Sequence, residues 1–500
     1  MPRRKVETHF PAQMQPGKEK INPINANNIG GGKPDVKRRL LQNHSAAYAV
    51  LVIIPVAAFV LILAAGAALP PPVGIAASSA NVVPPTQSAL RLPIFLAEIA
   101  VIIAVSRVFG MVMRKLGQPQ VVGEMIAGLA LGPSLLGIAW PAAYSWLFPA
   151  GTVRFLNALS QIGLVLFMFL VGLELDLKQV RARGWQILVM SHAGMAMPML
   201  GGGVLAIFLY HDYSPVDITF AQFTLFFACA MSVTAFPVLA RILAERNLSA
   251  TTLGATAMAC ASMADVTAWG LLAIALALER GTGNVPAVLW HTLLGVAVFL
   301  SIMFFIIRPA LACLWRKAVA RDGTLMHDEL TLILLVILVS ALATEWINIH
   351  AIFGAFVAGV IMPRDGRLQS AMRTRLEDIL IVLLLPLFFA FTGLRTNIGL
   401  LDTPCDWCFA LLIMVVAVAG KLGGSAVAAR VSGIGWREAG ALGVLMNTRG
   451  LMELVLLTIG LQDGVITPAL FTMMVLMAVV TTMMTVPLLA RLVPSTVRAT

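Results

Sequence analysis

The chain has 500 residues, of which 59% are hydrophobic and only 12% are charged, and its mean hydropathy is +0.90. These values exclude a water-soluble globular protein, in which about 25% of residues are charged. The net charge of +11 does not indicate a nucleic-acid partner, because the basic residues lie in an N-terminal arm and between apolar runs, as in a polytopic membrane protein.

The first 45 residues form a basic arm that carries nine Lys and Arg residues. Its polar composition predicts a disordered cytoplasmic tail. A cleaved signal peptide is disfavoured, since the first apolar run begins late and is too long for such a peptide. Residues 46–69 therefore predict an extra N-terminal transmembrane helix. Residues 491–500 predict a second cytoplasmic tail.

Apolar runs of spanning length recur along the rest of the chain. Together with residues 46–69 they predict about fourteen transmembrane helices in an all-α membrane protein. Both termini are expected in the cytoplasm, because the basic loops then fall on one side. The separation near Ile349 is the least distinct. The predicted ranges are 46–69, 90–112, 120–139, 155–177, 185–209, 220–240, 252–278, 286–312, 328–348, 350–362, 378–399, 407–429, 437–461 and 465–490.

The sixth and seventh predicted helices lie within residues 226–277 and carry unusual polar features. Pro237 interrupts the sixth helix just after Thr234, since proline cannot donate a helical hydrogen bond. Asp265 lies near the centre of the seventh, where an ionised carboxylate costs several kcal/mol unless it faces water or a partner. A broken helix beside a buried carboxylate predicts a cation site built from carbonyl and carboxylate oxygens. The alternative is a proline kink beside a structural aspartate.

Two motifs of the first half recur in the second half. Residues 123–128 (GEMIAG) resemble residues 354–359 (GAFVAG), and residues 166–173 (LFMFLVGL) resemble residues 387–394 (LFFAFTGL). The offset of seven helices is odd, so the repeats have inverted topology, as in many alternating-access transporters. Repeat one covers about 90–280, and repeat two covers about 328–490.

The repeat predicts a second broken helix at the thirteenth position, opposite the break in the sixth. Residues 445–453 (LMNTRGLME) interrupt an apolar run there. Lys421 lies in the middle of the twelfth helix, too deep to reach either interface, and a charge pair with Asp265 or Glu453 is expected. A structural tie through Lys421, or a local Arg449–Glu453 salt bridge that only holds the break, is the alternative.

These motifs resemble the monovalent cation:proton antiporter-2 family, which includes Kef-type and plant cation/proton exchanger relatives of bacterial sodium/proton antiporters. The similarity covers roughly residues 90–490, and its order and spacing carry more weight than any one motif. It implies a sodium/proton antiporter-like fold with two crossed broken helices, and a homodimer. The matching segments are Gln118-Pro119 followed by GEMIAGLALGPSLLG, then VGLELDL, TAFPVLARIL, ASMADVTAW, PLFFAFTGL and MNTRGLMEL.

The resemblance also implies roles for individual residues. Asp265, Thr234 and Lys421 are expected to form the cation/proton-binding site. Asp265 inherits the position that binds cation and proton alternately, Thr234 matches the first unwound segment, and Lys421 matches a Gly-Lys element of some sodium/proton antiporters. One residue departs from the pattern: Ala264 stands where relatives commonly carry Asp, Asn or Gln, which leaves the stoichiometry open and Lys421 without its usual neighbour. The residues that match the second break are Asn447, Thr448, Arg449 and Glu453.

The expected function is secondary active exchange of Na⁺ or K⁺ for H⁺ across the bilayer, most simply the bacterial inner membrane, with both ions competing for Asp265. Spans 5–7 and 12–14 are expected to move against spans 3–4 and 10–11. An enzyme is disfavoured, since no nucleophile–base pair or metal-ligand cluster lies in the spans, and no cofactor is expected. The alternatives are a K⁺ channel and a ligand-gated Kef-type protein that needs a separate regulatory subunit.

Overall fold

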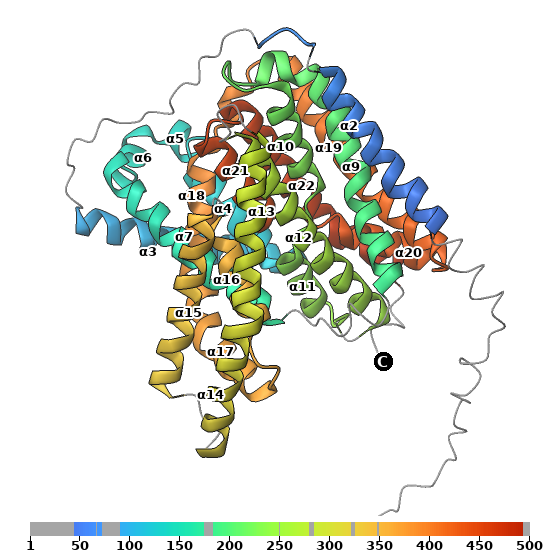
Figure 1. The fold of residues 1–500 in the computed structure, drawn as a ribbon. Helices are drawn as coiled ribbons and strands as arrows, with labels where there is room; N and C mark the ends of the chain where they lie inside the picture. The colour runs from blue at the N-terminus through green and yellow to red at the C-terminus, as the bar shows by residue number, and fades with distance from the viewer. Residues whose placement is uncertain are drawn as a thin grey trace, which may run out of the picture. The chain divides into compact units, whose positions relative to one another are not determined.

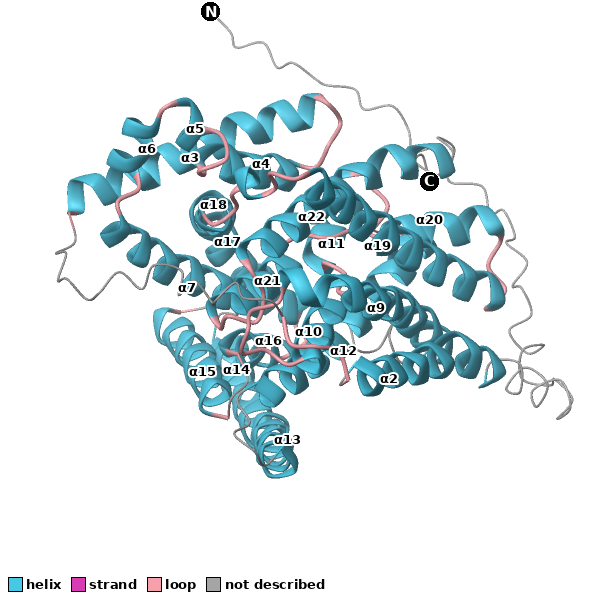
Figure 2. Cartoon of the chain, turned by 90° about the horizontal axis from the view of Figure 1, so that it is seen from above, coloured by secondary structure: helices cyan, strands magenta, loops and turns pink. Residues whose placement is uncertain are grey.

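A computed structural model describes residues 45–66, 68–72, 91–174, 184–249, 251–279, 285–321, 326–347 and 350–493. Within these ranges the regular elements are helices, without a strand (Figure 2). The predicted tails at 1–45 and 491–500 lie outside the described residues except at their inner ends. At the second of these ends, α22 continues to Leu492, so the helix runs slightly past the predicted limit of 490.

The first half of the chain contains η2 (Ala49–Ile53), α2 (Ile54–Gly66), α3 (Leu92–Lys115), α4 (Gln120–Leu131), α5 (Leu136–Ala139), α6 (Pro141–Leu147), α7 (Ala150–Glu174), α9 (Gly184–Tyr213), α10 (Phe220–Ser232), α11 (Phe236–Glu245) and α12 (Thr252–Glu279). The second half contains α13 (Val285–Ile302), η3 (Met303–Ile307), α14 (Arg308–Arg321), α15 (His327–Trp346), α16 (Ala351–Val360), α17 (Gly366–Ile379), η4 (Leu380–Leu384), α18 (Leu385–Leu394), η5 (Ile398–Leu400), α19 (Pro404–Val431), α20 (Trp436–Met446), α21 (Leu451–Gln462) and α22 (Pro468–Leu492).

Among the described residues, ten helices are long and apolar enough to cross a membrane. Shorter apolar helices occupy Phe220–Ser232, Ala351–Val360 and Met452–Gln462. The chain is therefore an all-helical, multi-span membrane protein. Each predicted range overlaps a helix, a continuous run of helices or a pair of half-helices. The predicted separation of two helices near Ile349 is confirmed, because α15 ends at Trp346 and α16 begins at Ala351.

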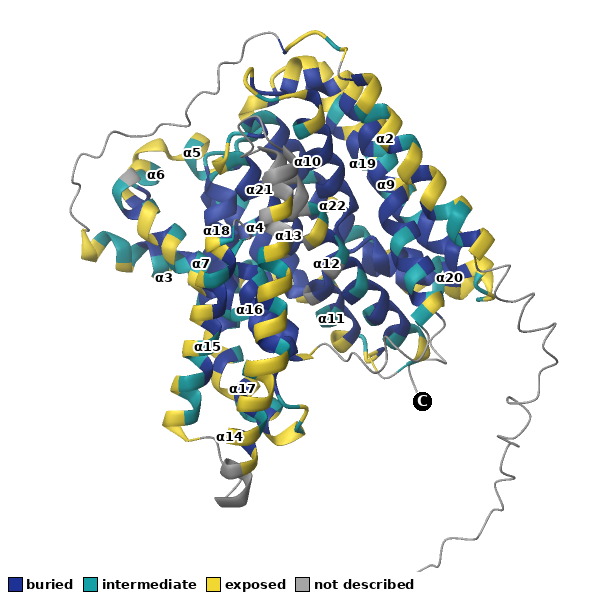
Figure 3. Ribbon diagram, viewed as in Figure 1, coloured by how far each residue is buried: buried dark blue, intermediate teal, exposed yellow. Residues whose placement is uncertain are grey.

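The helices of residues 46–493 pack into two groups (Figure 1). The core group consists of α9, α10, α11, α12, α19, α20, α21 and α22, with α2 lying along α9 and α10. The scaffold group consists of α3, α4, α7, α15, α16, α17 and α18. The segment α13–η3–α14 connects the groups along the chain, and α22 contacts α4 directly. Buried residues concentrate around α10, α21 and α22, whereas α13 and α14 show exposed faces (Figure 3).

Glycines bring the scaffold helices of the two repeats into backbone contact. A Cβ atom on Gly128 in α4 would lie 2.2 Å from the carbonyl oxygen of Phe389 in α18, and one on Gly359 in α16 would lie 2.1 Å from that of Phe169 in α7. No side chain fits at such distances, so only glycine permits these crossings. Gly128 and Gly359 occupy the same position of the repeated motif. The two crossings are therefore equivalent, as the inverted repeat predicts.

The N-terminal helix, Ser45–Gly66, agrees with the predicted extra span at 46–69. It packs on the core group rather than on the scaffold group. Phe59 is only 2% exposed and fits beside Gly203 of α9, where a Cβ atom would lie 2.7 Å from the Phe59 ring. The phenyl ring of Phe220 in α10 leaves no space for a side chain at Gly66. These close contacts fix the position of the N-terminal helix against α9 and α10.

Candidate functional site

The first predicted break is confirmed. Helix α10 ends at Ser232, residues 233–235 are non-helical, and α11 begins at Phe236. Pro237 lies in the first turn of α11, where its missing N–H removes no helical hydrogen bond. The break therefore exposes the C-terminal end of one half-helix and the N-terminal end of the next within the core group.

The second predicted break is confirmed as well. Helix α20 ends at Met446, and α21 begins at Leu451. Between them Gly450 has a φ angle of +147°, a conformation that residues with a side chain rarely adopt. Glycine at this position lets the chain reverse from one half-helix into the next.

The two breaks contact each other through hydrogen bonds. The backbone N–H of Ala235 donates to the carbonyl oxygen of Thr448 at 3.0 Å. The Thr234 hydroxyl donates to the carbonyl oxygen of Met446 at 3.3 Å. Thr234 was expected to satisfy a carbonyl freed by a break, and the carbonyl that it satisfies belongs to the opposite break. These bonds join the two repeats at the centre of the core group.

Two buried cations cap the end of α10. Arg449 donates from Nη2 to the carbonyl oxygen of Met231 at 2.5 Å and from Nη1 to that of Ala230 at 3.2 Å. The Lys421 ammonium donates to the carbonyl oxygen of Ser232. The last carbonyls of a helix lack intrahelical partners and carry its negative dipole end. Both side chains are fully buried, so they neutralise that end without water.

Arg449 also pairs with Glu453, which lies in the first turn of α21. The Nη1–Oε1 distance is 3.1 Å. Lys421 has Asp265, Glu453 and Arg449 within electrostatic range, but its direct contact is with Ser232. Lys421 therefore ties α19 to the first break, as the structural alternative expected, and its expected charge pair with Asp265 or Glu453 is not a direct contact among the described residues.

Asp265 lies on α12 and is 2% exposed. Neither of its carboxylate oxygens has a side-chain hydrogen-bond partner among the described residues. Lys421 and the backbone N–H of Phe236, at the positive end of α11, are the groups that act on it electrostatically. The neighbouring Ala264 is fully buried and adds no polar group. Asp265 is therefore a buried carboxylate at a helix N-terminus, and the described residues supply it with no side-chain hydrogen bond.

The seven predicted site residues are all buried, and most of them meet at the two breaks. Asn447 ends α20, and its side-chain oxygen has no hydrogen-bond partner among the residues described. Thr482 of α22 was not predicted: its hydroxyl donates to the Arg449 carbonyl at 2.7 Å and accepts from the Arg449 N–H at 3.2 Å. In the sequence, the feature that could have pointed to Thr482 is a cluster of threonines within an otherwise apolar predicted span.

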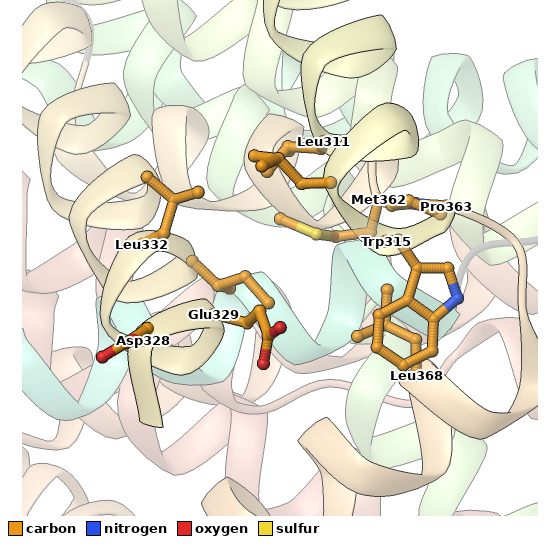
Figure 4. A pocket seen from close by; sticks show the side chains of 10 residues that line it. Leu311, Trp315, Asp328, Glu329, Leu332, Met362, Pro363 and Leu368 are labelled. Atoms are coloured by element: carbon orange, nitrogen blue, oxygen red, sulfur yellow. The ribbon is translucent and has the colours of Figure 1, made fainter. Parts of the chain in front are cut away.

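A separate cavity of about 230 Å³ lies between α14, α15 and α17 (Figure 4). Leu311, Trp315, Met362 and Leu368 contribute apolar walls, and Glu329 contributes a carboxylate. None of the predicted site residues lines this cavity. It is thus distinct from the crossing of the broken helices.

The chain is similar to characterised ion exchangers over most of its length. Residues 99–493 match the family described as sodium/hydrogen exchanger, transmembrane. The Na⁺/H⁺ antiporter NhaS4 of Synechocystis sp. is 44% identical over 405 residues, which cover 81% of this chain and 98% of that protein. Cation/H⁺ antiporter 20 of Arabidopsis thaliana is 40% identical over 403 residues, covering 79% of this chain and 48% of that protein.

K⁺/H⁺ antiporter 1 of Saccharomyces cerevisiae is 34% identical over 417 residues, covering 82% of this chain and 48% of that protein. The match thus spans about half the length of these plant and yeast relatives. The structure of the sodium proton antiporter MjNhaP1 from Methanocaldococcus jannaschii aligns with a TM-score of 0.54 and 15% identity, covering 79% of this chain and 96% of that one. This likeness shows a shared fold.

Proposed function

The chain belongs to the sodium/hydrogen exchanger family and is a monovalent cation/proton antiporter, and we propose that Asp265 is the group for which its two ions compete. A protonated Asp265 carries H⁺, and an ionised Asp265 binds Na⁺ or K⁺. Because one carboxylate cannot hold both ions, each ion can cross only when the other has left. This competition couples the two fluxes.

One observation carries the proposal: Asp265 is 2% exposed, and its two carboxylate oxygens have no side-chain hydrogen-bond partner among the described residues. A buried carboxylate without a partner is costly when ionised, so a proton or a cation is required to compensate it. The extended backbone between α10 and α11 adjoins this carboxylate, and we propose that its carbonyl oxygens complete the cation's oxygen shell.

Lys421, Arg449 and Glu453 support the site without binding the transported ion. Lys421 and Arg449 neutralise the carbonyl end of α10, which would otherwise attract a cation away from Asp265. Glu453 balances Arg449. Thr234, Asn447 and Thr448 belong to the crossing that holds the two half-helix pairs in register. In this proposal these residues fix the field around Asp265.

Exchange by alternating access requires the core group to move against the scaffold group. Glycine-mediated crossings within the scaffold group support a rigid frame for such a movement. We further propose fourteen membrane crossings with cytoplasmic termini, from the alternation of basic loops, and a homodimer formed through the scaffold group. The plasma membrane of a bacterium is the proposed location.

The test measures cation-dependent dissipation of a pH gradient in proteoliposomes, with Li⁺, Na⁺, K⁺ and Rb⁺ from pH 6 to 9. Asp265→Asn is compared with wild type and with Asp212→Asn, a change at a side chain that is 61% exposed. We expect exchange by wild type and Asp212→Asn, and none by Asp265→Asn at equal protein incorporation. Normal exchange by Asp265→Asn would refute the site, and cation flux without proton coupling would favour a channel.

A further inference from the structure

A chain of hydrogen bonds joins the N-terminal helix to α12 by way of α9. The Tyr48 hydroxyl lies 2.9 Å from Nδ1 of His192. Nε2 of the same ring lies 3.1 Å from the hydroxyl oxygen of Thr267. The Thr267 hydroxyl in turn donates to the carbonyl oxygen of Met263 at 3.0 Å. Four residues on three helices thus form one continuous connection.

The donors and acceptors of this connection fit a neutral imidazole. The Thr267 hydroxyl uses its proton on Met263, so its oxygen accepts from Nε2–H of His192. A neutral imidazole protonated at Nε2 has an acceptor at Nδ1, and the Tyr48 hydroxyl donates to it. Each polar group then has a partner. A second proton, placed on Nδ1, would remove the acceptor that Tyr48 uses.

Aromatic packing fixes Tyr48 in this position. Its ring centroid lies 5.5 Å from that of Trp185 and 5.9 Å from that of His192 in an edge-on arrangement. Further along the same helix, Phe59 is inserted beside Gly203 of α9. Tyr48 precedes residues 99–493, which match the exchanger family. One end of the connection therefore lies outside the segment that matches the family, and the other residues lie within it.

Thr267 follows Asp265 by two positions on α12. Two residues correspond to about 200° of rotation around a helix, so the two side chains lie on nearly opposite faces. We call this hydrogen-bonded connection the tether. It holds the face of α12 opposite Asp265 and so restrains the rotation that would turn Asp265 out of the site. The N-terminal helix therefore affects the orientation of Asp265 through the opposite face of α12, without contacting Asp265.

We infer that Tyr48 and His192 are positioning residues for the exchange reaction, and that protonation of His192 weakens the tether, because Nδ1 then donates, the Tyr48 oxygen must accept, and the Tyr48 proton is left without its acceptor. This inference rests on the proposed function, in which Asp265 is the exchange site. With His192 neutral, the N-terminal helix holds α12 in the orientation that favours ion binding. With His192 charged, Tyr48 loses its acceptor and α12 is held less firmly. Exchange therefore slows on the acid side through His192, in addition to protonation of Asp265.

Other titratable groups surround α9, but the contacts found for them do not involve His192. Cys229 approaches the Ala268 carbonyl, Cys260 approaches the Ile187 carbonyl, and Asp406 accepts from Tyr213. On the elements packed against α9, the titratable and charged residues whose side chains are described are Tyr48, Cys229, Cys260, Asp265, Cys405, Asp406, Cys408, Lys421 and Arg430. Of these, Tyr48 is the one that hydrogen-bonds His192.

The experiment compares full-length wild type with Tyr48→Phe, His192→Gln and Thr267→Val in proteoliposomes between pH 5 and 8.5. Glutamine can accept from Tyr48 and donate to Thr267 without titrating, so it is the conservative rescue. We expect Tyr48→Phe and Thr267→Val to lower the exchange rate at pH 8 about fivefold, the equivalent of one net hydrogen bond. We expect His192→Gln to keep the pH 8 rate and to lose less activity at pH 5 than wild type. The control is Tyr144→Phe, whose ring packs on Phe148 in the scaffold group.

A purely structural tether would give a different pattern. Tyr48→Phe would then lower thermal stability equally at every pH, and His192→Gln would keep the wild-type pH profile; that outcome overturns the inference. A transport-independent arm follows thermal unfolding of wild type and Tyr48→Phe, whose melting temperatures should differ at pH 8 and approach each other as the pH is lowered to 5. If wild type shows no exchange at all, the proposed function fails, while this thermal arm still tests the tether.

Discussion

Arg449 and Glu453 form a salt bridge of 3.1 Å in which neither side chain is exposed. The same guanidinium caps the carbonyl oxygens of Ala230 and Met231 on the other repeat. One buried cation therefore compensates a carboxylate and a helix end, and it joins the two broken helices. Removing either charge leaves the other groups buried without their partner.

This arrangement predicts a strongly asymmetric pair of variants. Arg449→Gln leaves the Glu453 carboxylate and two carbonyls uncompensated, so we expect a loss of about 3–5 kcal/mol in the free energy of unfolding. Glu453→Gln costs less, because Arg449 keeps its two carbonyl partners. The double variant should recover part of the loss of Arg449→Gln. Unfolding in detergent by thermal and denaturant titration measures these values.

Arg373→Gln is a matched control for this comparison of single and double variants. Arg373 also pairs with a glutamate four residues on, Glu377, but its side chain is 59% exposed. We expect a change of less than about 1 kcal/mol there. A double variant no more stable than Arg449→Gln would contradict the balancing role assigned to Glu453.

Gly450 is predicted to tolerate no side chain. Its φ angle is +147°, and a Cβ atom would lie 3.0 Å from Cγ2 of Val238 on α11. We expect Gly450→Ala to cost about 1–3 kcal/mol and to slow exchange, because the strain falls on the crossing itself. Gly464→Ala is the control, since its φ is +74° with open space around it. Equal effects of the two changes on exchange would argue against a special role for the crossing.

Two arginines of α11 and its C-terminal end link the core group to the scaffold group. Arg241 lies 3.8 Å from the buried carboxylate of Glu124 in α4, and Arg246 donates to the carbonyl oxygen of Gly117 at 2.5 Å. If the groups move during exchange, these contacts exist in one conformation and break in the other. We expect Arg241→Gln to shift the balance away from the conformation described here.

Hydrogen–deuterium exchange measures that shift. Backbone amides of α11 and of the α3–α4 turn should exchange faster in Arg241→Gln, and the apparent KM for the cation should change by about fivefold for a contact worth 1 kcal/mol. Arg437→Gln is the control, because Arg437 donates to Leu492 within the core group. Unchanged amide exchange in Arg241→Gln would contradict a conformation-specific link.

Asp365 gives a prediction of pH dependence outside the membrane-spanning segments. The Trp315 indole N–H donates to its carboxylate at 2.8 Å, and the backbone N–H of Arg367 donates at 2.9 Å; the indole bond is the main cause that holds the pKa of Asp365 below its usual value. A group with a lowered folded pKa stabilises the protein above its unfolded pKa, about 3.9 for Asp. That stabilisation disappears as pH falls through the folded pKa.

Trp315→Phe should therefore lower the melting temperature slightly at pH 7. The difference from wild type should begin to shrink as the pH falls below about 4 and disappear below the folded pKa, where the carboxylate is protonated in both the folded and the unfolded state. Asp365→Asn serves as the comparison, since it cannot titrate. A Trp315→Phe deficit that is constant from pH 7 to pH 3 would show lost packing rather than a lost charge-assisted hydrogen bond.

Much of the fold followed from local patterns in the sequence. Apolar runs of spanning length predicted where the helices lie, because a bilayer leaves no other way to satisfy backbone polar groups. Pro237 and the segment 445–453 predicted both breaks, since proline, glycine and polar residues interrupt a helix locally. The repeated motifs at 123–128 and 354–359 contain corresponding glycines, and these lie at the two scaffold crossings. Each of these signals lies within one helix or in a comparison of two segments.

The partners of the charged side chains were decided only by the tertiary structure. The sequence placed Lys421 and Arg449 deep in the membrane, but carbonyl oxygens of Ser232, Ala230 and Met231 are their acceptors. Every residue carries a carbonyl, so composition cannot reveal which ones a break leaves without a partner. Likewise, Tyr48 reaches His192 across 144 positions of the chain. Packing of separate helices brings these groups together, and no local pattern records it.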